Sequence, residues 1–194
     1  MFGHLSLKTV RWRPVEGEGL EHLTLRDTKT SICVESVLIG SEAGETFGVH
    51  YQIDCDAGWH VRTFAVRSTS GKRLEMQSDG QGRWQLGDGT PQPQFDGCID
   101  IDFTGTPFSN TLPIRRLDPA PSDGSIRLRV LYVPFATLRP LADNQIYTCL
   151  DRGRKYRYEA ADRPFIADLQ VDSDGFVIDY PGLFERVSRP EKTS

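Results

Sequence analysis

The stretch FGVHYQIDC, residues 47–55, alternates apolar and polar side chains with a period of two. Successive side chains of a β-strand point to opposite faces, so this pattern predicts a strand with one buried and one solvated face. The buried face is expected to hold Phe47, Val49, Tyr51, Ile53 and Cys55. The same alternation occurs in IRLRVLYV (126–133) and FIADLQVD (165–172). Such half-buried strands are typical of an antiparallel sheet with one face toward water.

Turn signals separate these predicted strands. LEMQSDGQGRWQL (74–86) predicts a hairpin across a Ser-Asp-Gly turn, and Ser-Asp-Gly recurs at 122–124 and 173–175. Strands and turns alternate about every 10 residues, a spacing typical of sandwiches, barrels and rolls. Helical patterning is scarce. SNTLPIRRL (109–117) is the best candidate for a short helix, with Ser109 or Asn110 as its cap and Pro113 in its first turn.

These signals predict a predominantly all-β protein with at most one or two short helical segments. We expect a single domain over residues 1–189, in which roughly a dozen mostly antiparallel strands curve into a roll or an open barrel. Curvature is favoured because a flat sheet with that many strands would leave its edges and one face exposed. Residues 190–194 are polar and are expected to form a flexible tail.

Charge and composition narrow the function classes. The formal net charge of −4 argues against general binding to nucleic acids or anionic membranes. No apolar run approaches the roughly 20 residues of a membrane span, so we expect no transmembrane segment. The N-terminal residues lack a signal-peptide pattern. The four cysteines are scattered without a C-x-x-C pair, which favours reduced, mostly buried thiols in a cytoplasmic protein. The oligomeric state stays open.

Residues 95–117, FDGCIDIDFTGTPFSNTLPIRRL, bring acids and arginines close together in the chain. Asp100 and Asp102 are two residues apart in a predicted strand, so both carboxylates should project to one face. We expect them to form one polar cluster with Arg115 and Arg116, in which one arginine is buried against an acid and the other is more exposed. The cluster is interpreted as a structural ion pair, a set of ligand contacts or, as a third alternative, an acid/base pair.

Glu21 is a second unusual carboxylate. In GLEHLTLRD (19–27) it shares a predicted strand face with Leu23 and Leu25. It either ends the buried stretch or projects into a polar pocket, where Arg115 or Arg116 would be a natural partner.

Motifs of standard enzymes are missing from the sequence. The four histidines do not have a common zinc spacing, and neither a G-x-S-x-G elbow nor a nucleotide-binding fingerprint follows a predicted strand. We therefore expect no catalysis, no metal and no cofactor. Aromatic residues are spread through the predicted strands instead. They are either ordinary core or, with a few polar groups, the lining of a cavity for a lipid or a sugar-bearing lipid. The candidate ligand-binding residues are Trp12, Glu21, Tyr51, Asp100, Asp102, Asn110, Arg115, Arg116, Tyr147 and Tyr180.

Four segments resemble a known family when they are taken in order. They are RW…EGEGLEHLTL (11–25), FDGCIDIDF with PFSNTLPIRRL (95–117), QIYTCL (145–150) and VDSDGFVIDYPGLFERV (171–187). Together they are similar to a family of bacterial proteins described as "putative glycolipid-binding". The resemblance implies a β-rich roll and a lipid-binding role.

The leading hypothesis is non-catalytic binding of an amphipathic small molecule, such as a glycolipid, in a cavity of the roll. Arg115 or Arg116 would hold an anionic or hydroxyl-rich head group. One alternative is hydrolysis of a glycoside-like bond, with Asp100, Asp102 or Glu21 as the acid/base pair. The other is a protein-interaction module without a small ligand, which an exposed apolar patch would favour.

Overall fold

The computed structural model describes residues 2–42 and 44–187, so the predicted tail at 190–194 lies outside the described residues. Within them, fourteen strands form one sheet in the order β7-β6-β5-β4-β3-β2-β1-β14-β13-β12-β11-β10-β9-β8. The strands are β1 (Leu7–Pro14), β2 (Leu20–Asp27), β3 (Ser31–Glu42), β4 (Glu45–Asp56), β5 (Val61–Ser68), β6 (Arg73–Ser78), β7 (Trp84–Leu86), β8 (Asp100–Phe103), β9 (Ser125–Val133), β10 (Leu141–Asp151), β11 (Lys155–Ala160), β12 (Ile166–Val171), β13 (Val177–Tyr180) and β14 (Phe184–Arg186). The prediction of a predominantly β protein is confirmed.

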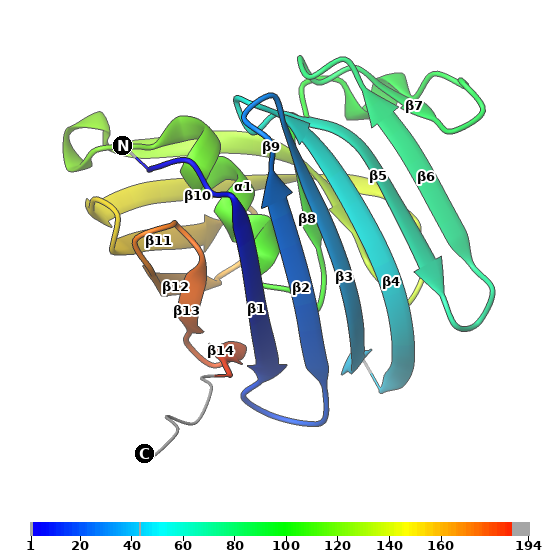
Figure 1. Cartoon of the computed structure of the whole chain (residues 1–194), viewed down its shortest axis with the longest axis horizontal. Helices are drawn as coiled ribbons and strands as arrows, with labels where there is room; N and C mark the ends of the chain where they lie inside the picture. Colours follow the sequence, from blue (N-terminus) through cyan, green and yellow to red (C-terminus); the bar gives the residue numbers. More distant parts are fainter. Residues whose placement is uncertain (1, 43, 188–194) are drawn as a thin grey trace.

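The sheet curves strongly but does not close, because β7 and β8 remain its two edges. Neighbouring strands are antiparallel except β8 and β9, which are parallel. The curvature carries β9 and β10 behind the front strands β1–β5 and leaves β11–β13 beside β1, and the single α-helix of the described residues, α1 (Phe108–Leu117), lies in the hollow between the two parts of the sheet (Figure 1). The edge strand β8 packs across the hollow, where the Phe103 ring lies 5.2 Å from Tyr51 and 5.3 Å from Phe64, centroid to centroid. The expected open roll is therefore confirmed.

The decisive alternation in β4 is reproduced in the structure. Val49, Tyr51, Ile53 and Cys55 are buried, whereas Gln52 and Asp54 are exposed. The hairpin predicted at 74–86 is formed by β6 and β7, with Ser78 opposite Trp84. All four cysteines are free thiols, and Cys33 alone is exposed.

The core consists of two buried clusters on either side of α1. The larger cluster fills the space between β8 and the strands β1–β5, and it includes Phe108 and Leu112 of the helix. The smaller cluster covers β10–β13 and includes Ile114. The helix is therefore held by apolar contacts on several sides, and its polar side chains are fixed in direction.

The start of α1 differs from the prediction. The helix begins at Phe108, without a side-chain cap from Ser109 or Asn110, and Pro113 lies inside it rather than in its first turn. Both expected caps have other partners, because Ser109 Oγ accepts the Phe103 N–H (2.8 Å) and Asn110 hydrogen-bonds to Tyr147. Thr106 Oγ1 instead accepts the N–H of Phe108 at 3.1 Å. The helix is thus tied to β8 and β10 from its first turn.

The last turn of α1 presents Arg115 and Arg116. The helix is capped after Leu117 by Asp118, a left-handed residue (φ 43°) whose N–H donates to the Ile114 carbonyl at 3.0 Å. Basic residues are favoured at this end by the helix dipole. No helix within 2–42 and 44–187 has the length and apolar character to cross a membrane.

Candidate functional site

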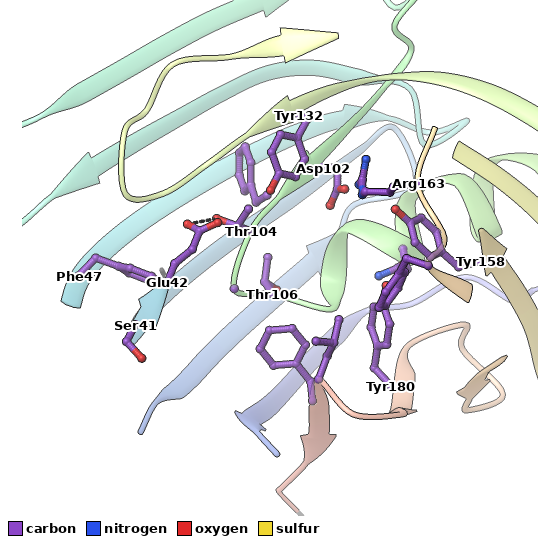
Figure 2. A pocket seen from close by; sticks show the side chains of 16 residues that line it. Ser41, Glu42, Phe47, Asp102, Thr104, Thr106, Tyr132, Tyr158, Arg163 and Tyr180 are labelled. Carbon is purple, nitrogen blue, oxygen red and sulfur yellow. Dashed lines mark hydrogen bonds between the residues drawn. The ribbon is translucent and has the colours of Figure 1, made fainter. Parts of the chain in front are cut away.

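A cavity of about 380 Å³ opens between β3, β8 and the β9–β13 side of the sheet (Figure 2). Its apolar wall is largely aromatic. The rings that line it are those of Phe47, Phe103, Tyr132, Tyr158, Phe165, Tyr180 and Phe184. Several of them contact one another edge to face, including Tyr158 with Phe165 at 5.9 Å and Tyr158 with Tyr180 at 6.3 Å. Such pairs hold ring orientations, so the wall is preformed. We call this space the aromatic cavity.

Asp102 and Asn110 form the polar part of the aromatic cavity. Gln145 donates from Nε2 to Asp102 Oδ2 at 2.6 Å, and the Tyr147 hydroxyl donates to Asn110 Oδ1 at 2.9 Å. Gln145 and Tyr147 both project inward from β10 and are buried. The Asp102 carboxyl also has a hydrogen bond from the Ser109 side chain, and its two oxygens can accept further bonds. One N–H of the Asn110 amide donates to the Pro107 carbonyl at 3.3 Å, and the other has no partner among the described hydrogen bonds. These groups can meet the hydroxyls of a ligand.

Asp102 has a perturbed acidity. The pKa of its carboxyl is raised to about 6, chiefly by burial and also by the nearby Asp143 carboxylate. The hydrogen bonds from Gln145 and Ser109 and the Arg163 charge offset part of this rise. Arg163 is held by Asp143, with both guanidinium contacts at 3.4 Å. Figure 2 shows Arg163 and Tyr158 beside Asp102. Near neutral pH, Asp102 can therefore accept or donate a hydrogen bond.

The opposite rim of the aromatic cavity is formed by the end of β3 and the segment after β8. Thr104 Oγ1 donates to Glu42 Oε2 at 3.0 Å (Figure 2). It also accepts the Phe135 N–H at 2.9 Å. Ser41 lies next to Glu42 at the same rim. This rim is polar and faces the aromatic wall across the opening.

A smaller cavity of about 260 Å³ adjoins the aromatic cavity. The residues that line both cavities are Ser41, Phe47, Gly105, Leu183 and Phe184. Trp12 and Glu21 line the smaller cavity on its far side. Together the two spaces form a two-part, mostly apolar hollow.

Glu21 lies on the apolar face of β2, as predicted, and is only 2 % exposed. Its Oε1 accepts hydrogen bonds from Ser36 Oγ (2.7 Å) and the Tyr51 hydroxyl (2.6 Å). Neither arginine is its partner, so that prediction is wrong: three neutral hydroxyl side chains surround the carboxyl instead. Burial raises the pKa of Glu21 to about 7, and the hydroxyls of Thr106, Tyr51 and Ser36 offset only part of this effect.

Asp100 and Arg116 form the predicted buried ion pair. Arg116 donates from Nε (3.0 Å) and Nη2 (2.6 Å) to the two carboxylate oxygens of Asp100, whose side chain is 1 % exposed. Asp102 also faces inward but hydrogen-bonds to Gln145 rather than to an arginine. The expected cluster of Asp100, Asp102, Arg115 and Arg116 is therefore not formed, and of these four only Asp102 reaches the aromatic cavity.

The prediction that the second arginine of the pair is more exposed is wrong for Arg115. It is 9 % exposed, and its Nη1 and Nη2 donate to the carbonyls of Asp174 and Gly3 at 2.6 Å each. Its guanidinium also lies over the Trp59 ring, 4.4 Å from the centroid. Arg115 is buried without an ion pair because backbone carbonyls and an aromatic face take the place of a carboxylate. The Arg116 side chain is 10% exposed, so neither arginine is markedly more exposed than the other.

The ten candidate residues are thus divided among several places. Asp102, Asn110 and Tyr180 line the aromatic cavity, and Trp12 and Glu21 line the smaller one. Tyr147 and Tyr51 support Asn110 and Glu21, respectively, by hydrogen bonds. Arg115 and Arg116 line a third cavity, and Asp100 lines none of these three.

Sequence reasoning missed several lining residues. Tyr132 and Tyr158 were visible only as aromatics within predicted strands, whereas Thr104, Thr106 and Arg163 carried no signal. Arg163 follows β11 in a short connection, and only the curvature of the sheet brings it near Asp102. Within the part of the chain that the structure describes, no three His, Cys, Asp or Glu side chains are grouped so as to hold a metal ion.

Comparisons with known proteins agree with this architecture. A crystal structure of a DUF1089 family protein from Pseudomonas aeruginosa matches with a TM-score of 0.76 and 41% sequence identity, over 86% of this chain and 92% of that chain. No protein with curated annotation matches. A family model described as "Putative glycolipid-binding" matches residues 9–186. Because that match extends over most of the sequence, the chain belongs to this family.

Proposed function

We propose that the protein binds an amphipathic ligand with a hydroxyl-bearing head group, such as a glycolipid, without chemically changing it. The observation that carries this proposal is the aromatic cavity, where one wall is made of rings and one end holds Asp102 and Asn110. Its volume of about 380 Å³ lies within the range of about 300–1,000 Å³ typical of small-molecule sites. The family description supports the same class of ligand.

The two walls have different roles in this proposal. Burial of an alkyl chain or a sugar face against Tyr158, Tyr180 and Phe184 supplies affinity, at roughly 25 cal/mol per Å² of apolar surface removed from water. The Asp102 carboxyl and the free Asn110 amide N–H select hydroxyl groups, because a ligand without a hydroxyl would take water from these polar groups and offer no hydrogen bond in return. The adjoining cavity beyond Phe47 offers room for a second apolar segment.

Hydrolysis through Asp100 and Asp102 has less support. A glycosidase needs two carboxyl groups on either side of one bond. Both oxygens of Asp100 are occupied by Arg116, and Asp100 does not line the aromatic cavity. Glu21 lines the adjoining cavity and is surrounded by hydroxyls. We therefore assign Asp102 a role in hydrogen bonding to the ligand rather than in acid/base catalysis.

Calorimetric titration with octyl glucoside below its micelle concentration, glucose and octanol tests the proposal. Octyl glucoside should bind more tightly than either part alone, because both walls are then used. Asp102→Ala should weaken octyl glucoside binding by about tenfold, the equivalent of one good hydrogen bond to a charged or polar partner, and leave octanol binding unchanged. Asp168→Ala, which removes a partly exposed acid of β12, is the matched control.

Two results would overturn the proposal. One is equal binding by wild type and Asp102→Ala, since the polar end would then have no role. The other is release of glucose from octyl glucoside during the incubation, which would favour the hydrolase alternative. Absence of binding by all three probes counts against the cavity as a site for this ligand class.

A further inference from the structure

A third cavity, of about 390 Å³, lies at the C-terminal end of α1. It is lined by the N-terminal segment 2–4, the turn after β2, the loop between β4 and β5, and the last turn of the helix. It shares no lining residue with the aromatic cavity or with the adjoining cavity. Asn110 and Arg115 mark the two sites on one helix, about 7 Å apart along its axis at 1.5 Å per residue. This third space, which we call the basic cavity, is therefore separate from the proposed ligand site.

Arg115 brings a buried positive charge to the basic cavity. Its Nη1 and Nη2 each use one N–H on a backbone carbonyl, and its Nε has no hydrogen-bond partner among the described residues. Burial lowers the pKa of Arg115, and the carboxylates of Asp174, Asp27, Asp172 and Asp118 offset only part of this effect. None of these carboxylates forms an ion pair with the guanidinium among the described residues, so an anion in direct contact with it would be stabilised.

Two charged groups around the basic cavity have ionic partners: Arg116 is held by Asp100, and Asp118 accepts from Arg152 at 2.7 Å. Asp27 lies 2.8 Å from His4 Nδ1, a pair that is ionic only when His4 is protonated. With His4 neutral, the charges that remain at the cavity are those of Arg115 inside, Lys29 at the exposed rim and Asp27. Two cations and one carboxylate leave this site net positive, in a chain whose net charge is −4.

Two of the residues that line the basic cavity have a strained backbone conformation. Trp59 (φ 67°) and Lys29 (φ 72°) both occupy the left-handed region, which side-chain-bearing residues rarely adopt. This conformation holds the Trp59 ring against the Arg115 guanidinium, 4.4 Å from its centroid. Strain of this kind concentrates at binding sites, where the surrounding structure maintains it.

We propose that the basic cavity binds the oxyanion group, a carboxylate or a phosphate, of a small organic anion. Arg115 and Lys29 are its cationic contacts. The unused Nη hydrogens of Arg115 donate to the oxyanion, and Trp59 with Phe2 contacts the uncharged remainder of the molecule. The basic cavity is separate from the aromatic cavity, so an anion can bind whether or not the aromatic cavity holds a ligand.

The test is titration of the whole protein with inorganic phosphate and with benzoate, using benzamide as the uncharged analogue of benzoate. We expect at least one of the two anions to bind with a dissociation constant of about 1 mM, and we expect no binding of benzamide. Lys29→Asn removes the rim charge but tolerates the left-handed backbone, and it should weaken anion binding about fivefold. Arg73→Asn, at an exposed position on β6, is the matched control.

The variants keep the inference falsifiable. Arg115→Lys removes the guanidinium fork and should abolish anion binding if the variant keeps the wild-type far-ultraviolet spectrum. If Arg115→Lys unfolds, Lys29→Asn decides the question alone. Equal weakening in Lys29→Asn and Arg73→Asn, or no anion binding by the wild type, would overturn the inference. Because octyl glucoside binds elsewhere, its titration with Lys29→Asn should be unchanged, so the two proposals fail independently.

Discussion

Replacing Arg116 with alanine is expected to lower the stability of the fold strongly, because it removes the partner of a buried carboxylate. The substitution removes both hydrogen bonds to Asp100, a carboxylate whose side chain is 1 % exposed. An uncompensated charge is then left between α1 and β8, and such changes cost about 3–5 kcal/mol of unfolding free energy. This is a large share of the roughly 5–15 kcal/mol that stabilises a typical domain.

Urea unfolding, followed by tryptophan fluorescence, measures this loss. The matched control is Arg157→Ala, which breaks a partly exposed ion pair with Asp168 and should cost less than about 1 kcal/mol. The double variant Asp100→Asn with Arg116→Ala should recover part of the loss, because the stranded charge is removed. A loss below about 1.5 kcal/mol for Arg116→Ala, or no recovery in the double variant, would refute the reasoning about this pair.

Two further predictions concern the buried acid and the packing of β8. Glu21 has a pKa of about 7 instead of 4.5, so the folded state holds its proton more tightly, and stability falls as pH rises from about 4.5 through 7. Glu21→Gln keeps an acceptor for Ser36 and Tyr51 but cannot ionise. In urea unfolding, the stability of this variant minus that of wild type should be on the order of 3 kcal/mol more favourable at pH 8 than at pH 4.5. A stability difference that does not change with pH would contradict this prediction. In the same assay, Phe103→Ala should lower the free energy of unfolding by about 3–5 kcal/mol. Ile166→Ala, at an exposed position, should lower it by less than about 1 kcal/mol. Similar losses in the two variants would show that β8 does not close the core.

The strand pattern was predictable because burial in a curved antiparallel sheet follows the period of two. β4 shows this well: Tyr51 and Ile53 are buried where the alternation predicts, and the turn chemistry at 78–80 gives the β6–β7 hairpin. The ion pair of Arg116 with Asp100 was also within reach, since buried charges need partners and the residues are close in sequence.

The parts of the site that were not predictable depend on long-range topology. Arg163, which follows β11, and Asp102 of β8 are brought together only when β8 pairs with β9 and the sheet curves. Arg115 is buried by carbonyls of residues 3 and 174, which no local pattern could identify as partners of a guanidinium. The hydroxyl environment of Glu21 likewise comes from β3 and β4 through the register of the sheet.

Native mass spectrometry of the gently purified protein tests the central claim of ligand binding most directly. The account predicts a species heavier than the chain by the mass of an amphipathic small molecule, which solvent extraction removes and which carries hydroxyl groups. Ser41→Trp places an indole at the opening shared by the two apolar cavities, and it should lower the occupied fraction, whereas Ser70→Trp in an exposed turn should not. A wild-type protein found only at the mass of its sequence, which takes up no octyl glucoside on incubation, would contradict the account.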